Sequence, residues 1–336
     1  MRADLRFTAM GTRARILVVD GPDDLPNQLA QRVRDLEQQW SRFIPTSEIS
    51  RLNQAGGAPV PVSPDTMRLL SCAIDGWEVT YGLFDPTVLG DIERAGYDRT
   101  FDELVDRDQV SQDVRRSWLV RGASGIELDR DTGIARLPAG VGFDPGGIGK
   151  GLATDLVADE ALAAGAAGVL VDLGGDIRVA GRPPAPAEDW TIEIDDPFGG
   201  LPLGAVALHE GAVASSSRLR RRWSVDGQTR HHLIDPRSGV PVEGDVAAVT
   251  VVAALGWQAE VLAKAAFVGG AVQGLGLVAQ VGGAALLIDA AGQMVPGPGW
   301  ERYGRDLHPD ADDGTSFDAT EANRPNHPTD PFGQVA

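Results

Sequence analysis

Apolar residues recur at helical spacing in the N-terminal part of the chain. A helix is predicted to begin near Asp23, with Pro26 in its first turn. Its apolar stripe consists of Leu29, Val33, Leu36 and Trp40. We predict three further helices over residues 63–81, 151–164 and 257–268.

Strand patterns are concentrated in the second half of the chain. Residues 168–173 read as a buried strand, and Trp190, Ile192 and Ile194 alternate with polar residues. Other predicted strands cover residues 206–208, 212–214 and 246–252, and residues 284–288 and 293–295 are expected to form a late hairpin. Strands and helices in this irregular order predict an α+β fold rather than a regular βαβ series.

The last part of the chain differs in composition from the rest. After Pro296-Gly297-Pro298-Gly299, residues are mainly Asp, Pro, Asn and Gly, with few aliphatic side chains. We therefore predict one folded domain over residues 1–300 and a disordered or loosely packed tail over 301–336.

Composition and charge exclude several classes of protein. The chain has 336 residues, is 43% hydrophobic and 23% charged, and carries a net charge of −18, which argues against a broad nucleic-acid surface. The single cysteine, Cys72, excludes an internal disulfide and a cysteine-based zinc site. The first apolar run, residues 16–19, is too short for a signal peptide, and no run is long enough to span a membrane. We expect a cytoplasmic protein without membrane insertion.

The strongest candidate for chemistry is a glycine-rich turn over residues 143–151 that leads into a predicted helix. Glycines allow a close backbone approach, and free N–H groups at a helix start attract anions. Lys150 adds a positive charge, so the turn is a possible pyrophosphate cradle. It is not a Walker loop, because Asp144 and Gly151 occupy positions where that motif has Gly and Ser or Thr. Judged on its glycine content alone, a tight turn with a surface lysine is the better explanation.

Four other segments combine turn residues with polar or aromatic side chains. Each has a plain structural explanation as a turn, a core aromatic or a solvated surface. They are Val171 to Asp176, His231 to Gly239, Tyr81 to Thr87, and the basic run Arg218 to Trp223.

The order of these segments is more specific than any one of them. In that order the chain resembles the ApbE family of flavin transferases up to about Gly270. The matches are Met10-Gly11-Thr12, Ser41-Arg42-Phe43 with Ser47 to Asn53, Gly82 to Thr87, Asp144 to Gly151, Leu170 to Asp176, and His232 to Gly239.

The resemblance implies mixed sheets with packed helices in two intimately associated subdomains. It also implies an FAD:protein FMN transferase, which splits FAD, attaches FMN through a phosphoester to a Thr or Ser of a partner protein, and releases AMP. The residues implied to bind FAD are Met10, Phe43, Asn53, Leu83, Phe84, Asp85, Asp144, Lys150 and Ile234. His232 and Asp144 are the implied catalytic residues.

The implied magnesium site departs from the family pattern. The family's metal helix reads Ala-Asp-x-x-x-Thr, whereas this chain has Ala259-Glu260 and Lys264. Gly147, Glu260 and Ala263 are the candidate Mg²⁺ ligands, and a protonated Lys264 cannot join them. Its ammonium group is expected either to neutralise phosphate in place of the metal or to form an ordinary helix-surface pair with Glu260.

Two alternatives to the transferase function follow from this departure. One is an FAD-binding protein with little catalysis, and the other is an FAD pyrophosphatase that uses water. A further alternative is self-modification, since Asp313 to Thr320 resembles the acceptor segment Asp-Gly-x-Ser/Thr-x-Ala-Thr with one extra residue.

Overall fold

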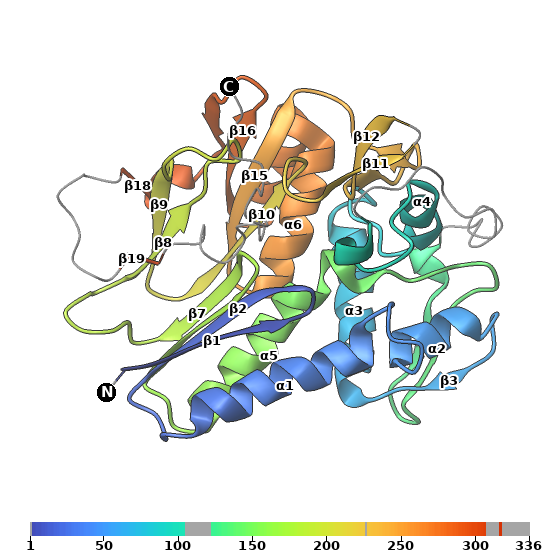
Figure 1. The fold of residues 1–336 in the computed structure, drawn as a ribbon, viewed down its shortest axis with the longest axis horizontal. Coiled ribbons are helices and arrows are strands. Elements are labelled where there is room, and N and C mark those ends of the chain that lie inside the picture. Colours follow the sequence, from blue (N-terminus) through green and yellow to red (C-terminus); the bar gives the residue numbers. More distant parts are fainter. Residues whose placement is uncertain (1, 105–121, 226, 307–315, 318–336) are drawn as a thin grey trace, which may run out of the picture.

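The structure is built around an eight-stranded sheet in which every neighbouring pair of strands is antiparallel (Figure 1). A computed structural model describes residues 2–104, 122–225, 227–306 and 316–317. In spatial order the strands are β1 (Arg2–Ala9), β2 (Thr12–Val19), β6 (Gly168–Leu173), β7 (Asp176–Gly181), β10 (Gly211–Ser217), β15 (Val246–Ala253), β16 (Ala284–Asp289) and β17 (Met294–Pro296).

Alternate residues of this sheet enter two different cores, because successive side chains of a strand point to opposite faces. Val169 and Val171 of β6 pack with helices α1 (Leu25–Trp40) and α5 (Gly149–Ala163). Leu170 faces the other way and packs with a second sheet. In spatial order, that sheet contains β18 (Gly304–Arg305), β9 (Gly204–Leu208), β8 (Trp190–Ile194) and β19 (Ser316–Phe317).

Helix α6 (Gly256–Gly269) covers the part of the large sheet that β10, β15 and β16 form. It continues through a π-helical turn, Gly270–Gly274, into α7 (Leu275–Gln280). The whole run 256–280 is long and apolar enough to cross a membrane by length and composition alone. More than half of its most apolar window is buried inside the protein, which is the pattern of a core helix.

A smaller, mainly helical part packs beside the large sheet (Figure 1). The hydrophobic core is continuous between the two parts, since Leu69 and Leu70 belong to the same core as Val261 and Ala265 of α6. Its elements are α2 (Glu48–Gln54), α3 (Pro64–Val79), α4 (Leu89–Arg94), the short 3₁₀ turns Phe101–Glu103, Ala123–Gly125 and Pro145–Gly147, and the three-stranded sheet of β3 (Val60–Pro61), β5 (Ile134–Arg136) and β4 (Glu127–Asp129).

Two short hairpins complete the described fold. One pairs β11 (Arg222–Val225) with β12 (Gln228–His231), and the other pairs β13 (Ile234–Asp235) with β14 (Val240–Pro241). Trp223 of the first hairpin is buried against the small part, where its ring nitrogen donates a hydrogen bond to the Ala95 carbonyl. The hairpins therefore connect the large sheet to the small part.

Helices α5 and α6 cap each other at their first turns. The Asp155 carboxylate of α5 accepts hydrogen bonds from the amides of Gly256 and Trp257, at 2.7 and 3.0 Å. Glu260 of α6 in turn accepts a 2.8 Å hydrogen bond from the amide of Gly151. The two helices approach each other so closely here that only glycine fits at position 151. A Cβ atom on Gly151 would lie 2.3 Å from the Gly256 carbonyl oxygen. Amides in a first helical turn lack intrahelical partners, so both carboxylates stabilise the pair.

The structure confirms the predicted α+β class and most predicted elements. The four predicted helices are α1, α3, α5 and α6, with ends shifted by a few residues, and the late hairpin is β16–β17. Strand β1 has no counterpart in the sequence prediction. Its residues alternate between exposed and half-buried at the edge of the sheet, so they carry no continuous apolar pattern.

The predicted boundary at residue 300 falls inside a short packed segment. Trp300 and Tyr303 pack against the core between the two sheets, and Gly304 and Arg305 pair with β9. Most of the predicted tail, including most of the acceptor-like segment, lies outside the described residues. Loose packing of the tail stays a prediction.

We predict that a chain ending at residue 299 is less stable than a chain ending at residue 317. The shorter chain lacks Trp300 and Tyr303, and each half-buried aromatic side chain contributes on the order of 1–2 kcal/mol by burial. Thermal unfolding followed by circular dichroism measures the difference. Equal melting temperatures would show that residues 300–317 do not stabilise the fold.

Candidate functional site

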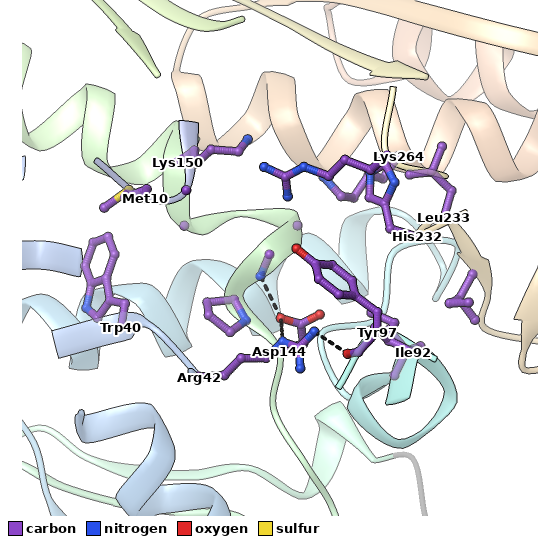
Figure 2. Close-up of a pocket in the computed structure, with 18 of the residues that line it drawn as sticks. Met10, Trp40, Arg42, Ile92, Tyr97, Asp144, Lys150, His232, Leu233 and Lys264 are labelled. Atoms are coloured by element: carbon purple, nitrogen blue, oxygen red, sulfur yellow. Dashed lines mark hydrogen bonds and ion pairs between the residues drawn. The ribbon is translucent and has the colours of Figure 1, made fainter. Parts of the chain in front are cut away.

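A cavity of about 250 Å³ lies where the two parts of the protein meet. It collects side chains from segments that are far apart in the sequence (Figure 2). Its walls come from the β1–β2 turn, the end of α1, the segment after α3, the glycine-rich turn before α5, the segment around β13, and α6. The lining residues include Met10, Trp40, Arg42, Phe43, Leu83, Phe84, Asp85, Tyr97, Asp144, Gly147, Lys150, Arg221, His232, Ile234 and Lys264.

Most residues singled out from the sequence line this cavity. Three do not: Asn53, Glu260 and Ala263 are absent from its wall. Each of the three is buried close behind the lining. The residues that do line it are Met10, Phe43, Leu83, Phe84, Asp85, Asp144, Gly147, Lys150, His232 and Ile234.

One wall of the cavity is aromatic and is held together by Arg42. The Arg42 guanidinium lies over the rings of Phe43 and Tyr97, 4.1 and 4.8 Å from their centroids. It also donates a 2.8 Å hydrogen bond to the Tyr97 carbonyl, and its Nε lies 3.4 Å from Oδ1 of Asp144. Planar guanidinium and aromatic groups stack favourably, so this wall is a fixed surface for a flat ring system.

Asn53 acts from behind the wall by fixing the glycine-rich turn. Its side-chain amide donates a 2.9 Å hydrogen bond to the Phe143 carbonyl and accepts one of 2.8 Å from the Phe143 amide. The next residue, Asp144, accepts a 3.0 Å hydrogen bond from the Gly146 amide and begins the 3₁₀ turn. Asn53 therefore positions Asp144 without contacting the cavity.

Four cationic side chains line the cavity, those of Arg42, Lys150, Arg221 and Lys264. Figure 2 shows Lys150 and Lys264, together with the His232 ring, on the side opposite Trp40, Arg42 and Asp144. Arg221 also lines the cavity, next to the first hairpin. These cations make the cavity suited to an anionic ligand although the chain as a whole is acidic.

Both lysines contact one buried carboxylate. The Nζ atoms of Lys150 and Lys264 lie 3.2 and 3.3 Å from Oε1 of Glu260, which is only 2% exposed. Lys150 also pairs with Asp176. The possibility of an ordinary surface pair between Glu260 and Lys264 is therefore wrong, because the carboxylate is buried and the ammonium lines the cavity.

Burial and the neighbouring charges set the protonation states of this group. Burial alone would raise the pKa of Glu260, but the two ammonium groups and the Gly151 amide together lower it below its usual value. Burial lowers the pKa of Lys150 to about 8, against the attraction of Glu260. At neutral pH Glu260 is therefore a carboxylate, and Lys150 is mainly an ammonium ion.

The residues that the resemblance implies as magnesium ligands are not arranged to bind a magnesium ion in this structure. The Lys264 side chain runs directly past Gly147, where a Cβ atom would lie 3.1 Å from Lys264 Cδ. Glu260 already accepts from two ammonium groups and one amide. No group of three or more His, Cys, Asp or Glu side chains within the described ranges is arranged to hold a metal.

His232 presents an unpaired ring nitrogen beside these cations. Among the described residues its Nδ1 has no hydrogen-bond partner although it is buried. Burial, reinforced by Arg221 and Lys264, holds the pKa of His232 well below its usual value. The ring is therefore neutral at pH 7 and able to accept a proton.

Sequence reasoning missed Arg42, Tyr97 and Trp40 as site residues. Arg42 stood inside a matched motif, at a position the motif leaves open, and its value lies in contacts with Tyr97 and Asp144 that are distant in sequence. Arg221 belonged to the noted basic run, but nothing in that run separates it from its neighbours. Arg220 pairs with Asp195 instead, and Arg222 is exposed.

Comparison with known proteins gives one consistent result. The chain matches the model of the ApbE family over residues 10–288. The FAD:protein FMN transferase of Treponema pallidum is 30% identical over 236 residues, which make up 66% of this chain and 65% of that protein. The FAD:protein FMN transferase of Haemophilus influenzae is 29% identical over 246 residues, or 70% of each chain.

Solved structures show the same fold. The crystal structure of the ApbE protein of Thermotoga maritima matches with a TM-score of 0.81 and 26% identity, and the match covers 91% of this chain and 100% of that chain. The flavin transferase ApbE of Vibrio cholerae matches with a TM-score of 0.76 and 23% identity, covering 90% and 99% of the two chains.

We predict that Asn53→Ala destabilises the protein and loosens the Asp144 turn. The substitution leaves a buried N–H and a buried C=O of Phe143 without partners, at a cost of about 1–3 kcal/mol for each group. Chemical denaturation measures the loss. Asn27→Ala on the exposed side of α1 is the matched control and should have little effect. Equal stabilities of the two variants would contradict the positioning role.

Proposed function

Because the chain belongs to the ApbE family, we propose that it is an FAD:protein FMN transferase that moves FMN from FAD to a Thr or Ser hydroxyl of a partner protein. The observation that carries this proposal is the arrangement of Lys150, Lys264 and Arg221 around one cavity with a neutral His232 beside them. Cations suit a diphosphate, and a neutral imidazole suits a hydroxyl that must lose its proton.

The aromatic wall and the cationic wall of the cavity would bind different parts of FAD. The wall of Phe43, Tyr97 and Arg42 would stack against a ring of FAD, while Met10 and the segment 83–85 close the sides of the cavity. The lysines on the opposite wall would hold the diphosphate. The start of α5 follows the glycine-rich turn, and the positive end of its helix dipole would favour phosphate oxygens there.

The proposed reaction is a phosphoryl transfer to a hydroxyl group. The acceptor oxygen attacks the phosphorus on the FMN side of the diphosphate, and its proton passes to the unpaired Nδ1 of His232. The bond from that phosphorus to the bridging oxygen breaks, and AMP leaves with the bridging oxygen. Positioning and charge neutralisation dominate such reactions, and the ammonium groups would stabilise the negative charge that develops on the leaving AMP.

The direct test of the function uses FAD with an acceptor protein that carries an Asp-Gly-x-Ser/Thr-x-Ala-Thr segment. We expect AMP release together with a mass increase of the acceptor by one FMN. Mass spectrometry of the enzyme itself tests self-modification in the same sample. AMP and free FMN without a modified protein would indicate a pyrophosphatase, and the absence of any AMP would contradict the proposed activity.

We predict that His232→Gln lowers the transfer rate by about 10²–10⁴-fold, the usual contribution of a general base. FAD affinity should change by less than about threefold, since the imidazole is neutral and carries no charge for the diphosphate. His209→Gln, at an exposed position, is the matched control.

The pH profile gives an independent check on this role. Because the folded protein holds the pKa of His232 below 6.5, kcat/KM should not decline on this account between about pH 8 and about pH 6.5, and should fall only below that range. A decline centred at or above pH 6.5 that persists in His232→Gln would assign the base to another group.

A further inference from the structure

The chain contains only two lysines, Lys150 and Lys264, among 30 basic residues of the Lys and Arg type. Both line the same cavity, and both ammonium groups contact the same carboxylate oxygen of Glu260. The other 28 of these basic residues are arginines. Lysine is thus confined to this one site.

The helix pair fixes the geometry of this lysine pair. Lys150 lies in the first turn of α5 and Lys264 in the middle of α6, and Glu260 connects the two helices through the Gly151 amide. Lys264 Nζ donates to Glu260 alone among the described residues, so two of its three N–H groups are free for a ligand. The pair is therefore preorganised, with donors left over on the cavity side.

We propose that the Lys150–Glu260–Lys264 cluster binds the diphosphate of FAD directly and removes the need for a divalent cation. This inference rests on the proposed function and concerns how the same cavity holds its substrate. One carboxylate between two ammonium ions leaves a net positive charge. The negative charge of Asp176 and the positive charge of Arg221 offset each other, so the net charge stays positive.

The same cluster disfavours a metal ion at this position. A divalent cation that approached Glu260 would meet two ammonium groups at close range, and like charges in a partly buried site repel strongly. It would also have to displace the Lys264 side chain from its place beside Gly147. The ammonium group of Lys264 takes the place that such a cation would occupy.

Calorimetric titration of the full-length protein with FAD tests the proposal, in chelator and in millimolar magnesium. We expect the wild-type affinity to differ by less than about threefold between the two buffers. Lys264→Thr should bind FAD about ten- to a hundredfold more weakly in chelator, the effect of losing a charged hydrogen bond, and should recover part of this loss in magnesium.

Two further variants separate charge from geometry. Lys264→Met has no oxygen or charge to offer, so it should bind weakly in both buffers. Arg222→Met removes one positive charge from an exposed residue outside the cavity, and its affinity should stay within about threefold of wild type.

The small number of lysines allows a second readout on the wild-type protein. Selective ¹³C-lysine labelling gives signals from these two side chains and leaves their N–H groups intact, and Lys264→Arg assigns the signals. In chelator, FAD should shift both lysine resonances, whereas magnesium without FAD should shift neither.

Wild-type binding of FAD that requires magnesium would overturn this inference and leave the proposed function standing. A Lys264 resonance that does not respond to FAD would overturn it as well. Failure to bind FAD in either buffer would overturn the proposed function and, with it, this inference.

Discussion

The site depends on the hydrogen bond and ion pairs of the buried Glu260 carboxylate. It accepts from the Gly151 amide and from the ammonium groups of Lys150 and Lys264, so one side chain joins two helices and two cations. A buried carboxylate is costly unless such partners surround it. Because α5 and α6 are locked further by Asp155, which caps α6, the cations keep a fixed place relative to the glycine-rich turn. The cavity wall is therefore rigid at the point where a diphosphate would sit.

Much of the fold could be predicted from periodicity because most elements are amphipathic or fully buried. Helix α1 has its apolar stripe, and β6 is buried along its whole length. Strand β1 could not be predicted in this way, since an edge strand with one wet face has no apolar run to mark it. Strand pairing could not be predicted either, because β2 pairs with β6, and 148 residues of chain lie between the two strands. Tertiary packing, not local pattern, decides such contacts. The predicted cytoplasmic location stays a prediction.

The site was predictable as a list of residues but not as a geometry. Ordered motifs identified Met10, Asp144, Lys150 and His232, and all four line one cavity. The same motifs placed Asn53 at the substrate, whereas it holds the turn from behind through Phe143. Motif position cannot separate a contact with the ligand from a contact with the loop that contacts it. Arg42 contacts residues from distant segments of the chain, so the sequence around Arg42 does not predict these contacts.

We infer that the lysine pair occupies the place where a metal would hold the diphosphate. A crystal structure of the FAD complex grown with manganese, with data collected for the anomalous signal of that metal, tests this inference. We expect diphosphate oxygens within hydrogen-bond distance of Nζ of Lys150 and Lys264, and no anomalous peak beside Glu260. A manganese ion bound to Glu260, with Lys264 turned away from the cavity, would contradict it.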